Sequence, residues 1–213
     1  MLLQRVGILG LVAAVTLTAA SPNLEIYWID AEGGASTLIV APSGEALLVD
    51  TANRAPNDRD AKRIYDVIQL AGLKKIDILL TTHYHGDHTG SLAALSKMIP
   101  IDLYLDHGVS MEIDRPQAAE LYKRYLDVVE GKRKSLVAGD KIQLKGIDIK
   151  VVTSDGKAIT SPLAGGGPNT ALCRNAEQKI VDKDPDNGGR YCQRMPYSSV
   201  SFRVTLKVSC RYA

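Results

Sequence analysis

Three of the four histidines of the chain lie within six consecutive positions, at His83, His85 and His88, and Asp87 lies among them. Imidazole nitrogens and carboxylate oxygens are the usual non-sulfur ligands of zinc, with bonds of roughly 2.0–2.2 Å. The alternative is a histidine-rich surface turn, but neutral imidazoles have few other reasons to gather so closely. The spacing therefore predicts a metal site. We expect Gly86 to give the backbone the freedom to turn Asp87 and His88 toward one cavity.

The elements on either side of this motif predict where it lies in the fold. Residues 76–80 (IDILL) have the apolar composition of a buried strand. Apolar residues between positions 92 and 99 recur at helical spacing, which predicts a short helix. The histidines thus occupy a loop at the end of a strand, which is where an α/β protein exposes reactive side chains.

The rest of the chain predicts an α/β (α+β) fold. Residues 24–30, 36–40 and 46–50 are rich in β-formers and are separated by turn signals, which indicates an antiparallel meander. A helix over 61–71 and a strand over 101–105 complete a parallel βαβ portion. Further on we expect a helix over 117–130, a hairpin of 141–144 with 147–152, a loop over 155–169 and a strand over 200–208. The basic run 132–134 is interpreted as a solvated loop.

Composition narrows the class of protein. The chain has 213 residues, 45% of them hydrophobic and 23% charged, which suits one globular domain rather than a disordered tail or a coiled coil. A net charge of +2 is too small to indicate a stable nucleic-acid partner. Three cysteines are too few for a disulfide scaffold. Cys173 and Cys192 either pair across a loop or stay free, and at least one of the three cysteines must lie outside an intrachain pair.

The first 20 residues have the layout of a secretory signal peptide. Arg5 is followed by an apolar run over 6–16 and by the small residues Ala19, Ala20 and Ser21. The apolar stretch is shorter than the roughly 20 residues that span a bilayer, which disfavours the alternative of a membrane anchor. We therefore expect a signal peptide over 1–20, a domain over 21–213, no membrane span after cleavage, and a secreted or periplasmic protein.

The order His83-x-His85-x-Asp87-His88 is similar to the signature of the metallo-β-lactamase superfamily of hydrolases. The opening meander, the strand end at Asp50 and the strand that leads into the histidines follow the family's order. The resemblance covers residues 24–106 well and continues more loosely to 208. It implies a four-layer αβ/βα sandwich with one or two zinc ions at one edge of its sheets.

Carried over by position, the resemblance implies a role for each residue of the motif. His83 and His85 resemble ligands of a first zinc ion, and Asp87 and His88 resemble ligands of a second. Asp87 is also the implied catalytic residue, because its carboxylate would accept a hydrogen bond and a proton from the attacking water. Asp50 resembles an aspartate that supports the site without binding metal. The implied reaction is hydrolysis of a small-molecule ester, amide or thioester, or of a phosphodiester.

The sequence also departs from the family's pattern. Many members supply a third histidine after a hairpin such as 147–152, where this chain has Asp155. His107 and Asp155 are the substitutes to consider, and some relatives of the DNA-uptake (competence) proteins lack this ligand. The similarity to that branch favours phosphodiesters. The family's bridging aspartate and last histidine would follow the strand 200–208, and they are absent.

These departures predict a C-terminally incomplete fragment that holds the N-terminal half of the sandwich and part of the second sheet. The alternative to an exported zinc hydrolase is then an inactive remnant or a metal-binding protein. The sequence does not predict an oligomeric state.

Overall fold

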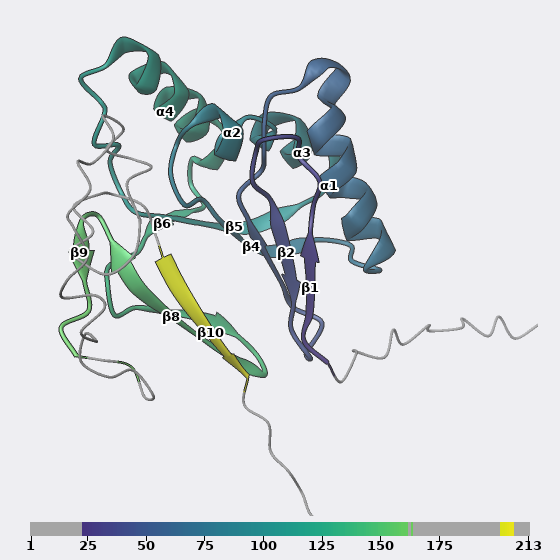
Figure 1. Cartoon of the computed structure of the whole chain (residues 1–213). Helices are drawn as coiled ribbons and strands as arrows, with labels where there is room; N and C mark the ends of the chain where they lie inside the picture. Colours follow the sequence, from purple (N-terminus) through teal and green to yellow (C-terminus); the bar gives the residue numbers. More distant parts are fainter. Residues whose placement is uncertain (1–22, 162, 164–200, 207–213) are drawn as a thin grey trace, which may run out of the picture.

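The computed structural model describes residues 23–161, 163 and 201–206, and these form two sheets and a layer of helices (Figure 1). The first sheet has six strands in chain order, β1-β2-β3-β4-β5-β6. The first three strands are antiparallel, and β3 to β6 are parallel. Their bounds are Glu25–Trp28, Thr37–Val40, Ala46–Val49, Ile76–Leu80, Ile101–Asp106 and Arg133–Ser135.

The second sheet is smaller and has the order β10-β8-β7, with β9 paired to β8. Strands β7 and β8 form the expected hairpin around Gly146, whose φ of 91° suits a glycine. Strand β10 pairs with β8 in antiparallel fashion, and Val204 lies opposite Ile149. The bounds are Lys141–Leu144 for β7, Ile147–Ser154 for β8, Lys157–Ala158 for β9 and Ser201–Leu206 for β10.

The helices cover one face of the first sheet, and the second sheet covers the other (Figure 1). In α1, Ala61, Ile64 and Ile68 are buried at the spacing of a single helix face. Helix α4 begins at Pro116, a favoured residue in the first turn. The helical elements are η1 (Pro56–Asp58), α1 (Arg59–Leu70), α2 (Gly86–Thr89), α3 (Leu92–Met98) and α4 (Pro116–Val129).

Two apolar clusters lie on opposite faces of the first sheet. Along β3, Leu48 packs into the cluster beneath the helices, whereas Leu47 and Val49 pack into the cluster against β7 and β8. Along β4, Leu79 faces the helices and Leu80 faces the second sheet. Successive side chains of a strand point to opposite faces, so continuous apolar strands are needed between two covering layers. This arrangement confirms the predicted α/β sandwich class.

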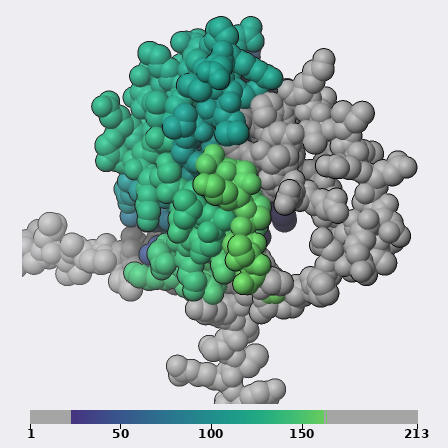
Figure 2. Space-filling view, turned by 90° about the vertical axis from the view of Figure 1, so that its left-hand side faces the viewer, coloured from purple at the N-terminus to yellow at the C-terminus, as the bar shows by residue number. Residues whose placement is uncertain are grey.

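Figure 2 shows the teal segments of the helical layer and the green segments of the second sheet as one continuous surface. Within the part of the chain described, no helix has the length and apolar character needed to cross a membrane. The proposed signal peptide over 1–20 and all three cysteines fall outside the described residues.

Two sequence-based expectations about local structure are wrong. The basic run 132–134 is not a free loop, because Arg133–Ser135 forms β6 at the edge of the first sheet, parallel to β5. The expected loop over 155–169 begins instead with a tight turn at Asp155 and Gly156, and Lys157–Ala158 returns as β9. Neither segment has an apolar period, so its pairing depends on the neighbouring strand.

Candidate metal centre

The histidine motif lies at the edge of the first sheet where the parallel strands end. Asp50 follows β3, His83 follows β4 by three residues, and His107 directly follows β5. The carboxyl ends of parallel strands meet at one edge, so residues distant in sequence converge there. The short helix α2 begins at Gly86 and carries Asp87 and His88.

Three of the four predicted metal ligands form one group in the structure, and His88 lies beside that group without belonging to it. One ligand atom from each of His83, His85 and Asp87 lies within 4.8 Å of the others. The rings of His83 and His88 have centroids 3.9 Å apart, and Asp87 Oδ2 lies 3.5 Å from His88 Nε2. The set contains two kinds of donor that suit zinc, imidazole nitrogen and carboxylate oxygen.

Asp50 is buried beside the motif and contacts Thr82 and His88. Its Oδ1 accepts the Thr82 backbone N–H at 2.7 Å, and its Oδ2 accepts the Thr82 hydroxyl at 2.7 Å. The same Oδ2 lies 2.8 Å from Nδ1 of His88. The Thr82 oxygen in turn lies 3.2 Å from Nδ1 of His83. One buried carboxylate therefore orients two imidazoles, one directly and one through a hydroxyl.

These contacts determine which ring nitrogens are turned toward the centre. The single hydroxyl proton of Thr82 is donated to Asp50, so we assign the proton between Thr82 and His83 to Nδ1 of His83. Nε2 of His83 is buried and has no hydrogen-bond partner among the described residues. An unpartnered buried acceptor is costly, and a bound metal ion would satisfy it. Because Nε2 of His83 is buried without a partner, the residues of the motif fit a bound metal ion.

The protonation states are consistent with such a site. Burial, together with the nearby imidazoles of His88, His85 and His107, lowers the pKa of His83 to about 2. His83 is therefore neutral at physiological pH, as a metal ligand must be. Burial disfavours the charged form of His88, but the hydrogen bond and charge of Asp50 outweigh it and raise the pKa of His88. Metal binding by His88 would then compete with protonation of its imidazole.

Glu112 is a site residue that the sequence did not indicate. It lies in the turns between β5 and α4, with its side chain 3% exposed, and its Oε2 is 2.7 Å from Nε2 of His85. Its other carboxylate oxygen forms an ion pair with Arg115. The motif gives no signal for this contact, because the two partners are 27 residues apart.

A buried polar cluster beneath the site was also missed. The Arg133 guanidinium lies 2.5 Å and 3.0 Å from the two oxygens of Asp106, which is fully buried. It also donates to the Gly108 carbonyl at 2.6 Å, and the Tyr84 hydroxyl donates to the same carbonyl at 2.5 Å. Tyr84, to which the motif assigned no role, therefore anchors the turn that follows β5.

The expected role of Gly86 in the motif is wrong. Gly86 does not have a positive φ, and a Cβ at this position would meet only Leu121, at 3.9 Å. The glycine that packing requires is Gly90, where a Cβ would lie 2.1 Å from the Arg54 nitrogen and 2.3 Å from the Gly86 oxygen. The backbone passes so close at Gly90 that no larger residue fits.

The two substitute ligands are not brought into the cluster. The group of ligand atoms within 4.8 Å of one another includes neither His107 nor Asp155. His107 is buried against Tyr84, with ring centroids 4.7 Å apart, and neither of its ring nitrogens has a partner in the described part of the chain. Burial lowers the pKa of His107 to about 4. Asp155 lies close enough for its charge to oppose that shift.

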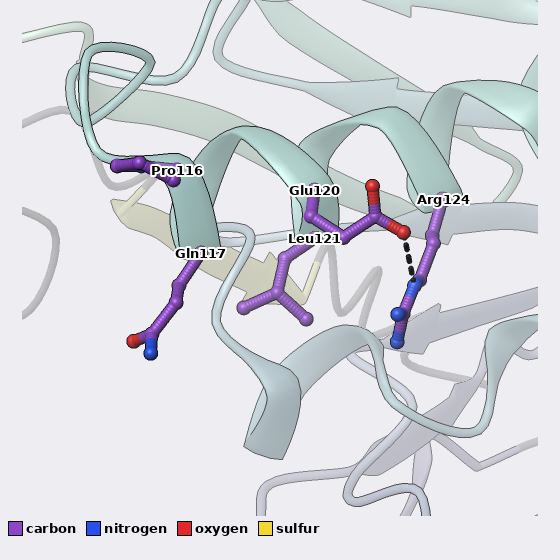
Figure 3. Close-up of a pocket in the computed structure, with 5 residues that line it drawn as sticks. All are labelled: Pro116, Gln117, Glu120, Leu121 and Arg124. Atoms are coloured by element: carbon purple, nitrogen blue, oxygen red, sulfur yellow. Dashed lines mark hydrogen bonds and ion pairs between the residues drawn. The ribbon is translucent and has the colours of Figure 1, made fainter.

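An open depression of about 410 Å³ lies along α4, and none of the predicted metal ligands lines it (Figure 3). Its polar side chains include Glu120 and Arg124, which form an ion pair with each other at 2.9 Å. Gln117 points away from this pair in the close-up. The depression presents no cluster of ligands, so the chemistry is assigned to the histidine motif.

The fold and the site together define an α/β sandwich with a candidate metal centre at one sheet edge, and the comparison with protein families places it in a known class. The family model of the metallo-beta-lactamase superfamily matches residues 29–170, so the chain belongs to this superfamily.

Curated relatives match parts of the chain. A UPF0173 metal-dependent hydrolase of Cupriavidus taiwanensis is 31% identical over 117 residues, which are 48% of this chain and 37% of that protein. A protein of the same description from Thermodesulfovibrio yellowstonii is 37% identical over 73 residues, 34% of this chain and 24% of that protein. An atrochrysone carboxyl ACP thioesterase of Cryptosporiopsis is 34% identical over 67 residues, 32% of this chain and 20% of the relative. The matches thus span well under half the length of these relatives.

Among solved structures, the chain is similar to the FEZ-1 metallo-beta-lactamase of Legionella gormanii, with a TM-score of 0.46 and 17% identity over 66% of this chain and 53% of that one. The MIM-1 metallo-beta-lactamase of Novosphingobium pentaromativorans has a TM-score of 0.43 and 21% identity over 59% of this chain and 46% of that one.

Proposed function

We propose that the protein is a zinc-dependent hydrolase whose centre is built on the histidine motif. The observation that carries this proposal is the convergence of His83, His85 and Asp87 at one sheet edge, with the buried Nε2 of His83 unpartnered. Membership of the superfamily and the names of the bacterial relatives, metal-dependent hydrolases, support it.

The ligands are assigned by position in the motif. We propose His83 and His85 as ligands of a first zinc ion, and Asp87 and His88 as ligands of a second. Asp50 acts through His88 and Thr82 rather than by binding metal, since both of its oxygens are already occupied by these contacts.

The chemistry follows from the donors. When bound, zinc polarises a carbonyl or phosphoryl oxygen and lowers the pKa of a water from about 15.7 to about 7. The Asp87 side chain is 41% exposed, so its carboxylate is accessible to a water and to a substrate. Asp87 would orient the attacking water and accept its proton. His83 and His88 would each offer a deprotonated Nε2 to the metal, with Nδ1 held by the protein.

We propose phosphodiesters as the substrates, with thioesters as the competing class. The resemblance to the DNA-uptake branch, which rests on the missing third histidine, supports phosphodiesters. Thioesters are the competing class because the fungal relative is named as a thioesterase. Both reactions need a positioned water and a stabilised oxyanion, so the ligands alone do not separate them.

The test is to load the purified chain with zinc, measure bound metal, and assay bis(p-nitrophenyl) phosphate beside a thioester and p-nitrophenyl acetate. Asp87→Ala should abolish most metal-dependent turnover, because it removes both a ligand and the proton acceptor. The control is Asp127→Ala, which alters an exposed pair with Lys123 on α4. Zinc binding with no turnover on any substrate would favour a metal-binding protein, and no bound zinc would contradict the proposal.

We also propose that the protein is exported, on the strength of the apolar run over 6–16 and the small residues at 19–21. Expression in a bacterium should place the protein in the periplasm with Ser21 at its N-terminus. Purified soluble cytoplasmic protein that retains Met1 would contradict this proposal.

A further inference from the structure

The carboxylate of Glu112 is held against the motif from outside it. Its Oε2 lies 2.7 Å from Nε2 of His85, and its other oxygen is paired with Arg115. The Glu112 side chain is 3% exposed, whereas the His85 imidazole is 23% exposed. A partly exposed imidazole can change its rotamer, so a buried and anchored partner restricts its orientation.

The turn that carries Glu112 is itself fixed at several points. The Glu112 N–H donates to the Ser110 hydroxyl at 3.2 Å, and the Arg115 N–H donates to the Glu112 carbonyl at 2.8 Å. Further back, the Gly108 carbonyl accepts hydrogen bonds from Tyr84 and Arg133. The backbone that carries Glu112 is therefore set by the fold, and its buried side chain reaches His85 from that fixed point.

The contact also decides the tautomer of His85. A carboxylate only accepts hydrogen bonds, so the proton of the pair lies on Nε2 of His85. A metal ion binds a deprotonated ring nitrogen, so His85 would have to bind through Nδ1. His83 has the opposite arrangement, with its Nδ1 held by Thr82 and its Nε2 turned inward.

We propose that Glu112 is a positioning residue of the metal centre: it holds His85 as the Nε2–H tautomer and orients its Nδ1 toward the metal. This inference rests on the proposed metal centre and deepens it. It assigns a role to the segment between β5 and α4, which contributes no residue to the motif.

The experiment compares zinc affinity and imidazole tautomer in Glu112→Ala, Glu112→Gln and the wild type. Zinc is titrated calorimetrically, and the ring nitrogens of His85 are observed by ¹⁵N NMR in the metal-free protein. We expect Glu112→Ala to lower zinc affinity about 10–100-fold and to give a mixture of His85 tautomers. Glu112→Gln should restore the Nε2–H tautomer and most of the affinity, because its amide oxygen accepts the same hydrogen bond.

The matched control is Glu120→Ala, which removes an exposed glutamate paired with Arg124 on α4 and should change neither measurement. Unchanged affinity and tautomer in Glu112→Ala, with a zinc-binding wild type, would overturn the role of Glu112 alone. Equal losses in the Ala and Gln variants, accompanied by a lower unfolding temperature in both, would show a structural role and overturn it as well. A wild-type protein that binds no zinc would overturn the metal centre itself.

Discussion

The hydroxyl of Thr82 donates to Oδ2 of Asp50 at 2.7 Å, across a separation of 32 residues in the chain. Thr82 lies between β4 and the first histidine, and Asp50 lies at the end of β3 with a φ of 60°. This positive φ is tolerated best by glycine, asparagine and aspartate. The contact joins two strand ends and fixes the ring of His83, so Thr82 belongs to the site although no motif marks it.

The first prediction concerns this hydroxyl. Thr82→Val keeps the shape of the side chain but removes the oxygen that holds Nδ1 of His83, and it leaves one Asp50 contact unmade. Zinc affinity should fall about 10-fold, as is common when a partner of a metal-binding histidine is lost. Thr82→Ser retains the hydroxyl and should bind zinc nearly as the wild type does. Equal affinity of the valine and serine variants, measured by calorimetry, would contradict the role of the hydroxyl.

The second prediction concerns the buried pair beneath the site. Arg133→Met leaves the fully buried Asp106 carboxylate without its cation, which should cost about 3 kcal/mol of unfolding free energy. Arg133→Lys should lose less, because it keeps the charge but not the fork that reaches both Asp106 and Gly108. Urea unfolding measures both losses.

The control for this prediction is Arg124→Met, which breaks an exposed pair with Glu120 and should change stability by about 0.5 kcal/mol or less. If Arg133→Met cost no more than Arg124→Met, the buried pair would not stabilise the protein as we describe.

The third prediction compares two glycines at the two ends of α2. Gly90→Ala places a methyl group within 2.1 Å of the Arg54 backbone nitrogen, so the backbone must move. We expect a destabilisation of about 3 kcal/mol and weaker zinc binding, since the shift displaces the neighbouring His88. Gly86→Ala should be tolerated, because its methyl group would meet only Leu121 at 3.9 Å. Thermal unfolding measures the stability of both variants. A Gly86→Ala variant less stable than Gly90→Ala would contradict the close packing at Gly90.

The fourth prediction concerns pH and the metal-free protein. The pKa of His107 is about 4 and that of His83 is about 2 in the folded chain, both below the ordinary 6.5. In the pH range between each folded pKa and 6.5, the unfolded chain binds a proton at that histidine and the folded chain does not. Their contribution to stability is therefore complete above about pH 6.5 and is lost as the pH falls. For His107 the loss by about pH 4 is roughly 3 kcal/mol. The raised pKa of His88 acts in the opposite sense, and its contribution is lost as the pH rises.

His107→Leu tests this assignment, because it removes the imidazole and both of its unpartnered nitrogens. In chelator, urea unfolding at about pH 7 and about pH 4.5 should show a shallower loss of stability for the variant than for the wild type. The variant should be at least as stable at pH 7, since no hydrogen bond is broken among the described residues. An unchanged pH dependence would mean that His107 is not the titrating group.

Much of the frame was predictable from local pattern. The meander, the strand Ile76–Leu80, the helix that begins near residue 60 and the hairpin around Gly146 all formed within a few residues of expectation. Their signals are short-range, since alternation and helical spacing appear within single segments. The motif at His83, His85, Asp87 and His88 was equally visible, because ligands close in sequence are recognised by spacing alone.

The tertiary structure decided how that motif is held. Thr82 pairs with Asp50 over 32 residues, His85 with Glu112 over 27, and Arg133 with Asp106 over 27. It also decided that Gly90 rather than Gly86 is required, and that most of the basic run at 132–134 belongs to the edge strand β6. Glu112 and Arg133 lie in segments without periodicity, where a charged residue is ordinarily solvated. The burial of Glu112 and the pairing of Arg133 with Asp106 depend on which strand ends become neighbours. That follows from the parallel order of β3 to β6 rather than from any local sequence pattern.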